Sequence, residues 1–193
     1  SPAPATPTGN LVPNGDFELG LTGWRGNGEG DVNLIWETVT TGVASGRKCL
    51  HNIPSATQKL AMLSRPIPAH PGRHYTFSIN MKCNPAPQWP RIEIYAITES
   101  GFTSVAPFPI YDRVNAAWTK LTRSFTLPSN SPARYLCVYF QYPTGYECWV
   151  DDVRLMAGDG PNVLTLKDKI SVGPQAAPPV GNLFPYTPGS KTP

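Results

Sequence analysis

Alternation between apolar and polar residues is the feature that most constrains the fold of this chain. The clearest set places four apolar side chains at every second position, namely Tyr75, Phe77, Ile79 and Met81. Similar alternation runs through residues 91–96 and 135–141, and shorter strand-like stretches occur at 33–40, 48–53, 59–64 and 120–127. Turns rich in proline and glycine separate these stretches, and no window keeps the apolar period of a helix. The pattern predicts an all-β fold, an antiparallel sandwich of two sheets with about nine strands.

Size and charge agree with one β domain that binds neither nucleic acid nor membranes. The chain has 193 residues, and its net charge of +3 comes from basic residues scattered without a run. A nucleic-acid-binding domain would gather such residues on one face. No apolar stretch approaches the ~20 residues needed to span a membrane. The chain begins at Ser1 without a methionine, so we expect a processed or excised part of a secreted protein.

Both ends of the chain have the composition of linkers. Residues 1–9 form a proline- and threonine-rich linker, and the two ends together hold nine of the 23 prolines. Residues 162–172 alternate like a strand that belongs either to the module or to a following domain. We therefore expect a module at residues 10–158, followed at 159–193 by an extended strand and a proline-rich linker toward a next domain.

Acidic segments near the two ends of this module are expected to lie together. Asp16 and Glu18 flank Phe17, and an extended chain would put both carboxylates on the face opposite the phenylalanine. Asp151 shares its parity with the apolar Val153, which predicts that Asp151 points inward. An inward carboxylate needs a partner. We therefore expect the first and last strands to meet around a cation.

Five sequence blocks support a resemblance to a known family. They are NLVPNGDFELGLTGW at 10–24, GRKCL at 46–50, PGRHYTFS at 71–78, WTKLTRSFT at 118–126 and WVDDVRL at 149–155. In this order they resemble the carbohydrate-binding modules of the cellulose- and xylan-binding jelly-roll type, within the galactose-binding-like superfamily. The resemblance implies a noncatalytic domain, attached to a polysaccharide-degrading enzyme, with a structural calcium ion.

The resemblance also implies the calcium ligands. They would be the Glu18 side chain, the backbone carbonyls of Asp16 and Lys48, and the Asp151 carboxylate, a set of hard oxygen donors that suits calcium. The alternative is that Asp16 and Glu18 are ordinary surface acids and that Asp151 pairs with an arginine.

Candidate sugar contacts come from aromatic and planar polar residues, because aromatic rings stack on the apolar faces of sugars. Trp24, Trp118 and Trp149 fall in the family blocks and are interpreted as structural. Trp89 lies in a proline-rich turn where apolar area is hard to bury, and Trp36 lies in a strand and could face either way. The candidate ligand-binding set is Trp36, Asn80, Trp89, Arg91, Glu93, Tyr95, Tyr139 and Gln141. The alternative is an ordinary solvated sheet face.

The four cysteines, Cys49, Cys83, Cys137 and Cys148, have no metal-ligand spacing, which leaves disulfides or buried thiols. Cys137 and Cys148 flank a turn and could approach each other across a hairpin.

The sequence favours a noncatalytic module that binds a polysaccharide for an attached enzyme. A rival interpretation is a spacer or protein-interaction sandwich that does not bind sugar. A more remote alternative is a hydrolase using two of Glu93, Glu99 and Glu147, or a lyase using Tyr95 with Arg91. No catalytic motif occurs, and the three histidines lack metal-ligand spacing.

Overall fold

A computed structural model of the chain describes residues 9–26, 36–52, 60–143 and 145–158. The chain divides into two units, Ser1–Ala157 and Gly158–Pro193, and all described residues except Gly158 belong to the first. The predicted linkers lie outside the described residues, except for Gly9 at the end of the first linker. Within those residues every regular element is a strand, and none is a helix long and apolar enough to cross a membrane.

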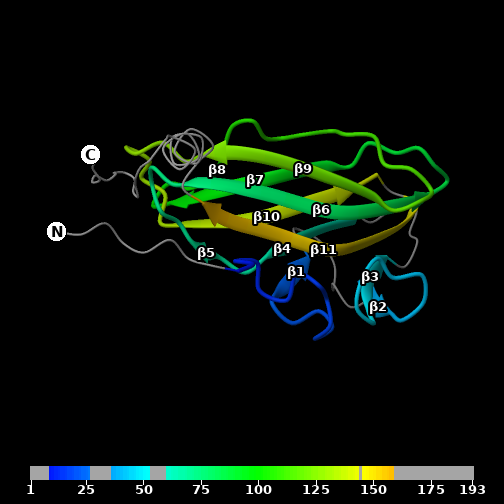
Figure 1. Cartoon of the computed structure of the whole chain (residues 1–193). Coiled ribbons are helices and arrows are strands. Elements are labelled where there is room, and N and C mark those ends of the chain that lie inside the picture. Colours follow the sequence, from blue (N-terminus) through cyan, green and yellow to red (C-terminus); the bar gives the residue numbers. More distant parts are fainter. Residues whose placement is uncertain (1–8, 27–35, 53–59, 144, 159–193) are drawn as a thin grey trace, which may run out of the picture. The chain divides into compact units, whose positions relative to one another are not determined.

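The strands form two antiparallel sheets that pack as a sandwich, which confirms the predicted fold class (Figure 1). Sheet A has the order β1–β4–β10–β7–β8, with β5 paired to β10 off this path. Its strands are β1 (Trp24–Gly26), β4 (Leu60–Ser64), β5 (Ile67–Pro68), β7 (Arg91–Thr98), β8 (Gly101–Ser104) and β10 (Tyr135–Tyr142).

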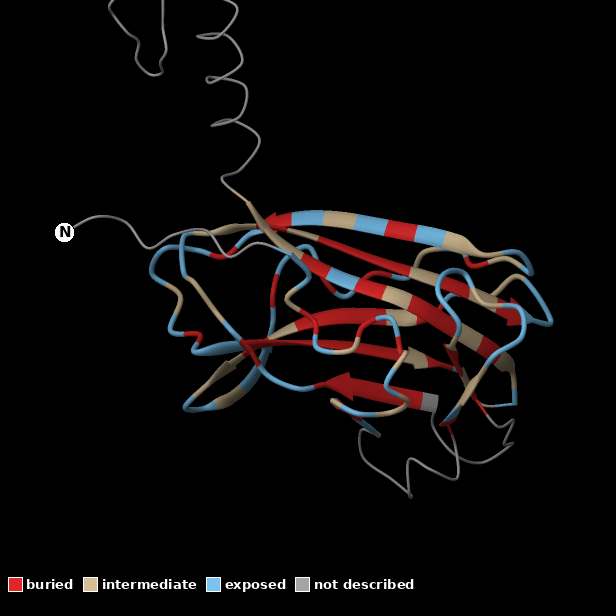
Figure 2. Ribbon diagram, turned by 60° about the horizontal axis from the view of Figure 1, so that its bottom comes forward, coloured by how far each residue is buried: buried red, intermediate tan, exposed pale blue. Residues whose placement is uncertain are grey.

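Sheet B has the order β2–β3–β11–β6–β9. Its strands are β2 (Trp36–Val39), β3 (Cys49–Asn52), β6 (His74–Asn84), β9 (Thr119–Thr126) and β11 (Glu147–Gly158). The long alternating strand predicted around Tyr75–Met81 is β6, and its apolar residues are buried in the core. Figure 2 colours the described residues by their burial. The short strands β1, β5 and β8 were not predicted, because segments of two to four residues show no clear alternation.

A continuous core fills the space between the two sheets. Sheet A contributes side chains such as Ile94 and Phe140, and sheet B contributes others such as Phe77 and Val150. Trp24 belongs to this core, where it packs against Phe17 (ring centroids 5.2 Å apart) and Phe140 (5.7 Å), as its interpretation as a structural residue requires.

The first and last segments of the module do lie together. The Leu11 amide donates to the Leu155 carbonyl (2.9 Å), and Val153 donates to the Gly15 carbonyl (2.8 Å). A β-carbon at Gly15 would lie 2.0 Å from the Val153 carbonyl oxygen, so only glycine fits there. The prediction of an extended strand at Asp16–Glu18 is wrong, because turns carry this segment and Phe17 enters the core with φ of 54°.

Asp151 is buried, as predicted, although not by simple alternation. Asp152 has φ of 52°, and the resulting irregularity puts both Val150 and Val153 in the core. Asp151 lies between them and is covered by the loop that precedes β3, whose Ala44 and Ser45 amides reach its carboxylate.

All four cysteines are free and buried. Cys137 lies on β10 of sheet A, and Cys148 lies on β11 of sheet B. The two strands are not hairpin partners, and Cys137 and Cys148 do not form the bridge that the sequence left open.

Candidate functional site

The outer face of sheet A gathers five of the predicted ligand-binding residues. Strand pairing between β7 and β10 sets Glu93 opposite Tyr139 and Arg91 opposite Gln141. Tyr95 follows Glu93 by two positions on β7 and so shares its face. Residues from two separate parts of the sequence thus form one surface because their strands are neighbours.

A buried carboxylate stands at the centre of this face. Glu93 has no exposed surface, and it accepts a hydrogen bond from the Tyr95 hydroxyl (2.6 Å). Ser104 on β8 donates to the other carboxylate oxygen, and the Arg91 guanidinium forms an ion pair with Glu93. Two of its partners, Arg91 and Tyr95, lie two positions away on the same strand, and the third, Ser104, lies on the adjacent strand β8.

Tyr95 is held as a neutral hydroxyl. Burial raises its pKa first of all, and the hydrogen bond to Glu93 and the charge of Glu93 raise the pKa further. Its proton points to Glu93. This arrangement argues against Tyr95 as the base of a lyase, since such a base must give up its proton near neutral pH.

Aromatic rings surround the carboxylate. The Tyr95 and Tyr139 ring centroids lie 5.6 Å apart, and Phe102 lies 5.7 Å from Tyr95. The Arg91 guanidinium carbon is 5.8 Å from the centroid of the Tyr139 ring. Tyr139 also belongs to a second apolar cluster, separate from the main core, with Ala61, Leu63 and Cys137, and Tyr95 and Ile97 pack against this cluster.

Exposed aromatic residues extend the face at one end. Two isolated antiparallel β-bridges join Gln88 to Val114 and Ile92 to Ile110. Both bridges have the same register, and this register sets Arg91, one position before Ile92, opposite Tyr111, one position after Ile110. Trp89 precedes Arg91 by two positions in this extended stretch, so both share a face. Trp89 is 52% exposed and Tyr111 is 55% exposed.

We call this surface the sheet A platform. It comprises Arg25, Trp89, Arg91, Glu93, Tyr95, Phe102, Tyr111, Tyr139 and Gln141. From Trp89 to Tyr95 it follows the chain over six positions, or about 20 Å at ~3.3 Å per residue. The surface is therefore longer than a single sugar ring.

Three platform residues were not predicted from the sequence. Arg25 lies opposite Leu63 on β4, which in turn lies opposite Tyr139. Phe102 belongs to the unpredicted strand β8. Tyr111 follows a single bridge residue outside any regular strand. For Phe102 and Tyr111, the one sequence signal of a binding role was an aromatic residue in a short segment without a strand pattern, and this signal is weak.

Two predicted ligand-binding residues lie elsewhere. Trp36 is a core residue on β2, packed edge to face with Phe140 at 5.8 Å, so the prediction that it contacts a ligand is wrong. Asn80 lies opposite Lys120 in sheet B, and the expectation that it sits beside the other residues is therefore also wrong. Sequence alternation located both strands, but it showed neither that Trp36 faces inward nor that Asn80 belongs to sheet B.

The outer face of sheet B has its own aromatic cluster, which is already internally paired. The Lys82 ammonium lies 4.9 Å from the Trp118 ring centroid and 4.8 Å from that of Trp149. Lys82 and the Trp118 indole both donate to the Gly42 carbonyl at 3.0 Å. His51 stacks on Trp149 at 4.9 Å. These contacts attach the loop before β3 to sheet B, in line with a structural role for both tryptophans.

Two of the expected metal ligands, Asp151 and Glu18, accept hydrogen bonds from that loop. Asp151 is fully buried and accepts hydrogen bonds from the amides of Ala44 and Ser45, each at 3.0 Å, and from its neighbour Asp152 at 2.7 Å. These partners are uncharged backbone groups rather than the arginine of the alternative interpretation. Burial raises the pKa of Asp151, although the three amides oppose this effect.

Glu18 reaches the same loop from the other side. Its Oε1 accepts hydrogen bonds from the amides of Arg47 (2.6 Å) and Lys48 (2.7 Å), and these bonds lower the pKa of Glu18. Asp16 is exposed. No cluster of three or more Asp, Glu, His or Cys side chains that could hold a metal occurs among the described residues. A calcium ion here would therefore depend on two carboxylates and on backbone carbonyls, a donor set that fits its chemistry.

The three acids considered for hydrolysis do not form a facing pair. Glu147 hydrogen-bonds His51 in sheet B (3.1 Å), whereas Glu93 is enclosed in sheet A. Glu99 lies at the turn after β7, where it pairs with Arg134 (2.6 Å). A hydrolase needs two carboxylates on either side of one bond, and these three are not placed in that way.

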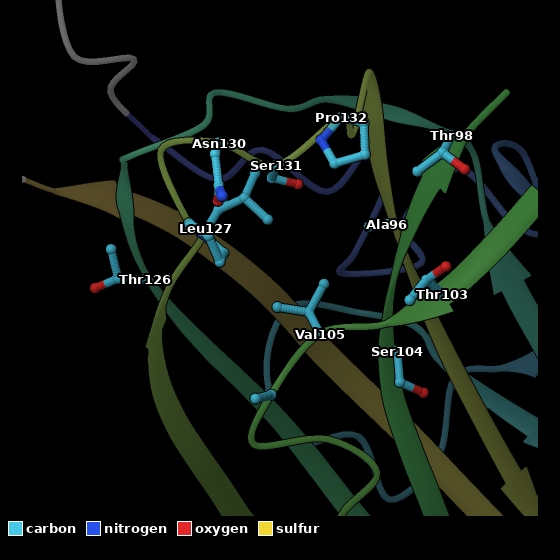
Figure 3. Close-up of a pocket in the computed structure, with 12 residues that line it drawn as sticks. Ala96, Thr98, Thr103, Ser104, Val105, Thr126, Leu127, Asn130, Ser131 and Pro132 are labelled. Atoms are coloured by element: carbon cyan, nitrogen blue, oxygen red, sulfur yellow. The ribbon is translucent and has the colours of Figure 1, made fainter. Parts of the chain in front are cut away.

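A pocket of about 410 Å³ opens where β7, β8 and β9 end (Figure 3). Hydroxyl groups of Thr98, Thr103, Ser104 and Ser131 line it together with apolar Val105 and Leu127. Its lining includes neither a charged nor an aromatic side chain. It therefore offers no ring for a sugar to stack on, in contrast to the sheet A platform.

Comparison with known proteins identifies related domains. A family model described as a carbohydrate binding domain matches residues 9–145. A comparison with curated protein sequences gives no significant match.

Several similar solved structures are carbohydrate-binding modules. One is the CBM22-1 xylan-binding domain from Paenibacillus barcinonensis Xyn10C, with a TM-score of 0.62 and 15% identity over 81% of this chain and 99% of that one. Another is a family 16 carbohydrate binding module, with a TM-score of 0.59 and 18% identity over 76% of this chain and 99% of that one. A third combines CBM22-1 and GH10 modules of Clostridium thermocellum xylanase 10B with xylohexaose (TM-score 0.54, 18% identity, 76% and 28% coverage).

At these identities the solved structures support the fold alone. The family model, however, covers most of the described β-sandwich and more than half of the chain. The chain therefore belongs to the carbohydrate binding domain family.

Proposed function

We propose that the sheet A platform binds a polysaccharide. The observation that carries this proposal is the gathering of aromatic side chains around a polar network on the outer face of one sheet. Five large apolar side chains are exposed among the described residues, and three of these, Trp89, Phe102 and Tyr111, belong to the platform. Exposed rings grouped in this way mark a binding surface.

The platform supplies both kinds of contact that a sugar polymer requires. Rings such as Tyr95 and Trp89 offer apolar faces for stacking. Arg91 and Gln141 offer hydrogen-bonding groups for hydroxyls, and Gln141 already accepts a hydrogen bond from Tyr139 at 2.7 Å. The polar groups are fixed by neighbours before a ligand arrives, which limits the entropy lost on binding.

We further propose that the module is noncatalytic, acts outside the cell and holds an attached polysaccharide-degrading enzyme near its substrate. A module that binds an extracellular polysaccharide has to be located outside the cell. Tethering raises the effective concentration of the enzyme on the polymer without any new chemistry. The xylanase neighbour, in which such modules accompany a GH10 module, supports this arrangement.

Calcium is the proposed structural cofactor. Glu18 and Asp151 would supply carboxylate oxygens, and Asp16 and Lys48 would supply backbone carbonyls. When bound, the ion would compensate the buried charge of Asp151 and fix the loop before β3. This role is structural, because the loop is attached to the outer face of sheet B through Gly42.

A binding experiment tests the main proposal. Isothermal titration against a panel of soluble polysaccharides should give measurable affinity for at least one of them. Trp89→Ala and Tyr111→Ala should each weaken that affinity, while Leu19→Ala should not, since Leu19 is exposed but lies in the turns before β1. Full affinity in both aromatic variants would move the site away from the platform, and no binding to any glycan would favour the spacer.

A further inference from the structure

The platform contains one acidic group, and that group cannot reach a ligand. Glu93 has no exposed surface. Its Oε1 accepts a hydrogen bond from Ser104, and its Oε2 accepts the hydroxyl of Tyr95 and pairs with Arg91. Both carboxylate oxygens thus have partners within sheet A, and any effect of Glu93 on binding has to pass through those partners.

Arg91 is the partner that a ligand can reach. Its side chain is 39% exposed, and one guanidinium nitrogen also approaches the Tyr95 hydroxyl oxygen at 3.5 Å. Burial alone would lower the pKa of Arg91, but the charge of Glu93 and the neighbouring tyrosines raise it. The guanidinium remains charged, and its charge is balanced by a carboxylate in direct contact.

A balanced guanidinium differs from a free one in what it attracts. Its remaining N–H groups still donate to sugar hydroxyls. Its attraction for a ligand carboxylate is reduced, because an approaching anion meets the negative charge of Glu93 beside the positive charge of Arg91. Because Glu93 is buried, solvent and salt screen this balance less than they would screen a pair of two surface charges.

We propose that Glu93 is a positioning residue that determines glycan specificity. It holds Arg91, Tyr95 and Ser104 in place, and by cancelling the charge of Arg91 it directs the platform toward uncharged glycans and away from anionic ones. This inference rests on the proposed function of the platform as a glycan-binding surface.

Glu93→Gln tests the inference with almost no change of shape. The amide retains an acceptor oxygen but removes the negative charge, so Arg91 becomes unbalanced. Isothermal titration should use xylohexaose and cellohexaose as neutral probes and hexagalacturonate as the anionic probe, each at low and high salt. Relative to the wild type, we expect the preference for the neutral probe over hexagalacturonate to fall roughly tenfold, the lower end for close charge pairs at interfaces. Affinity for hexagalacturonate should also become strongly dependent on salt.

Two further variants act as controls. Glu93→Gln combined with Arg91→Gln restores a neutral pair and should return the salt dependence to that of the wild type, since Arg25 is present in both. Arg91→Gln alone leaves Glu93 unbalanced and should weaken hexagalacturonate binding relative to the wild type. It also provides the charge test if Glu93→Gln fails to fold, which thermal unfolding will reveal.

The outcomes separate the inference from the function on which it rests. A wild type that binds none of the three probes contradicts both for these glycans. A wild type that binds a neutral probe, with Glu93→Gln unchanged in preference and salt dependence, overturns the inference and leaves the function intact. The same holds if the wild type already prefers hexagalacturonate.

Discussion

Individual aromatic residues in this module have separable roles, because some rings are buried and others are exposed. Trp24 packs between Phe17 and Phe140 in the core. Trp24→Ala should therefore lower the free energy of unfolding by about 3–5 kcal/mol, as expected for removal of a large buried ring. Urea denaturation measures this change, and Leu19→Ala serves as an exposed apolar control. A loss below about 1 kcal/mol would contradict the core assignment.

Tyr139 shows why exposure has to be known before a binding variant is chosen. The sequence suggested a platform residue with little effect on folding, but the ring is only 5% exposed and belongs to an apolar cluster. Truncating it would disturb folding and binding together. Trp89 and Tyr111 are the better probes, since both are more than half exposed.

Buried thiols provide a second test at the residue scale. All four cysteines are free, and burial raises the pKa of Cys137 to about 12 and that of Cys49 to about 11. The thiolate is the reactive form. We therefore expect negligible reaction with a thiol reagent at pH 8 in the native protein, and reaction of all four after denaturation without reductant. Fewer than four thiols in denaturant would reveal a disulfide.

At the scale of elements, the loop before β3 connects the two ends of the module. Its amides donate to Glu18 from the first segment and to Asp151 on β11. Gly46 within it has φ of 61°, and a β-carbon there would lie 2.5 Å from Glu18 Oε1. The loop therefore packs closely on the carboxylates proposed to bind calcium.

Calcium should raise the thermal stability of the module, because a ligand that binds only the folded state stabilises that state. At a calcium concentration 100-fold above its dissociation constant the gain is about 2.7 kcal/mol. Glu18→Ala and Asp151→Ala should each remove most of the difference in Tm between calcium and chelator, as measured by calorimetry. An identical Tm in calcium and in chelator for the unaltered protein would contradict the proposal.

The sequence predicted where individual strands lie and which of their sides is apolar. It did not predict which strands pair with one another in a sheet. Alternation located β6, β7 and β10 and the apolar side of each, because that pattern depends on one strand alone. It did not show that β6 belongs to sheet B, so Asn80 was placed with residues of sheet A. Pairing partners depend on the whole chain, and a single residue such as Asp152 with positive φ changes which side chains face inward.

The platform was predicted in part for the same reason. Arg91, Glu93, Tyr95, Tyr139 and Gln141 alternate on two long strands, and those strands are neighbours in sheet A. Phe102 and Tyr111 lie in segments too short or irregular to show a pattern. The burial of Glu93 could not be inferred either, since it arises from donors on a neighbouring strand and at nearby positions on its own.

At the scale of the whole molecule, the two sheets have different outer faces. On sheet B, Trp118 and Trp149 are engaged with Lys82, and this cluster holds a loop. On sheet A, the rings of Trp89, Phe102 and Tyr111 remain exposed around a polar network. A sandwich with one self-contained face and one open aromatic face is suited to bind an extended ligand on a single side.

A matched pair of double variants tests this central claim most directly. Trp89→Ala with Tyr111→Ala removes two rings from the sheet A platform, and Leu19→Ala with Thr122→Ala removes exposed side chains from the turns before β1 and from β9 of sheet B, away from the platform. Isothermal titration against the polysaccharide that the unaltered module binds best should show a loss of at least ~2 kcal/mol for the first pair, a hot-spot effect, with little change for the second. Equal affinity in both folded double variants would contradict the assignment of glycan binding to the sheet A platform.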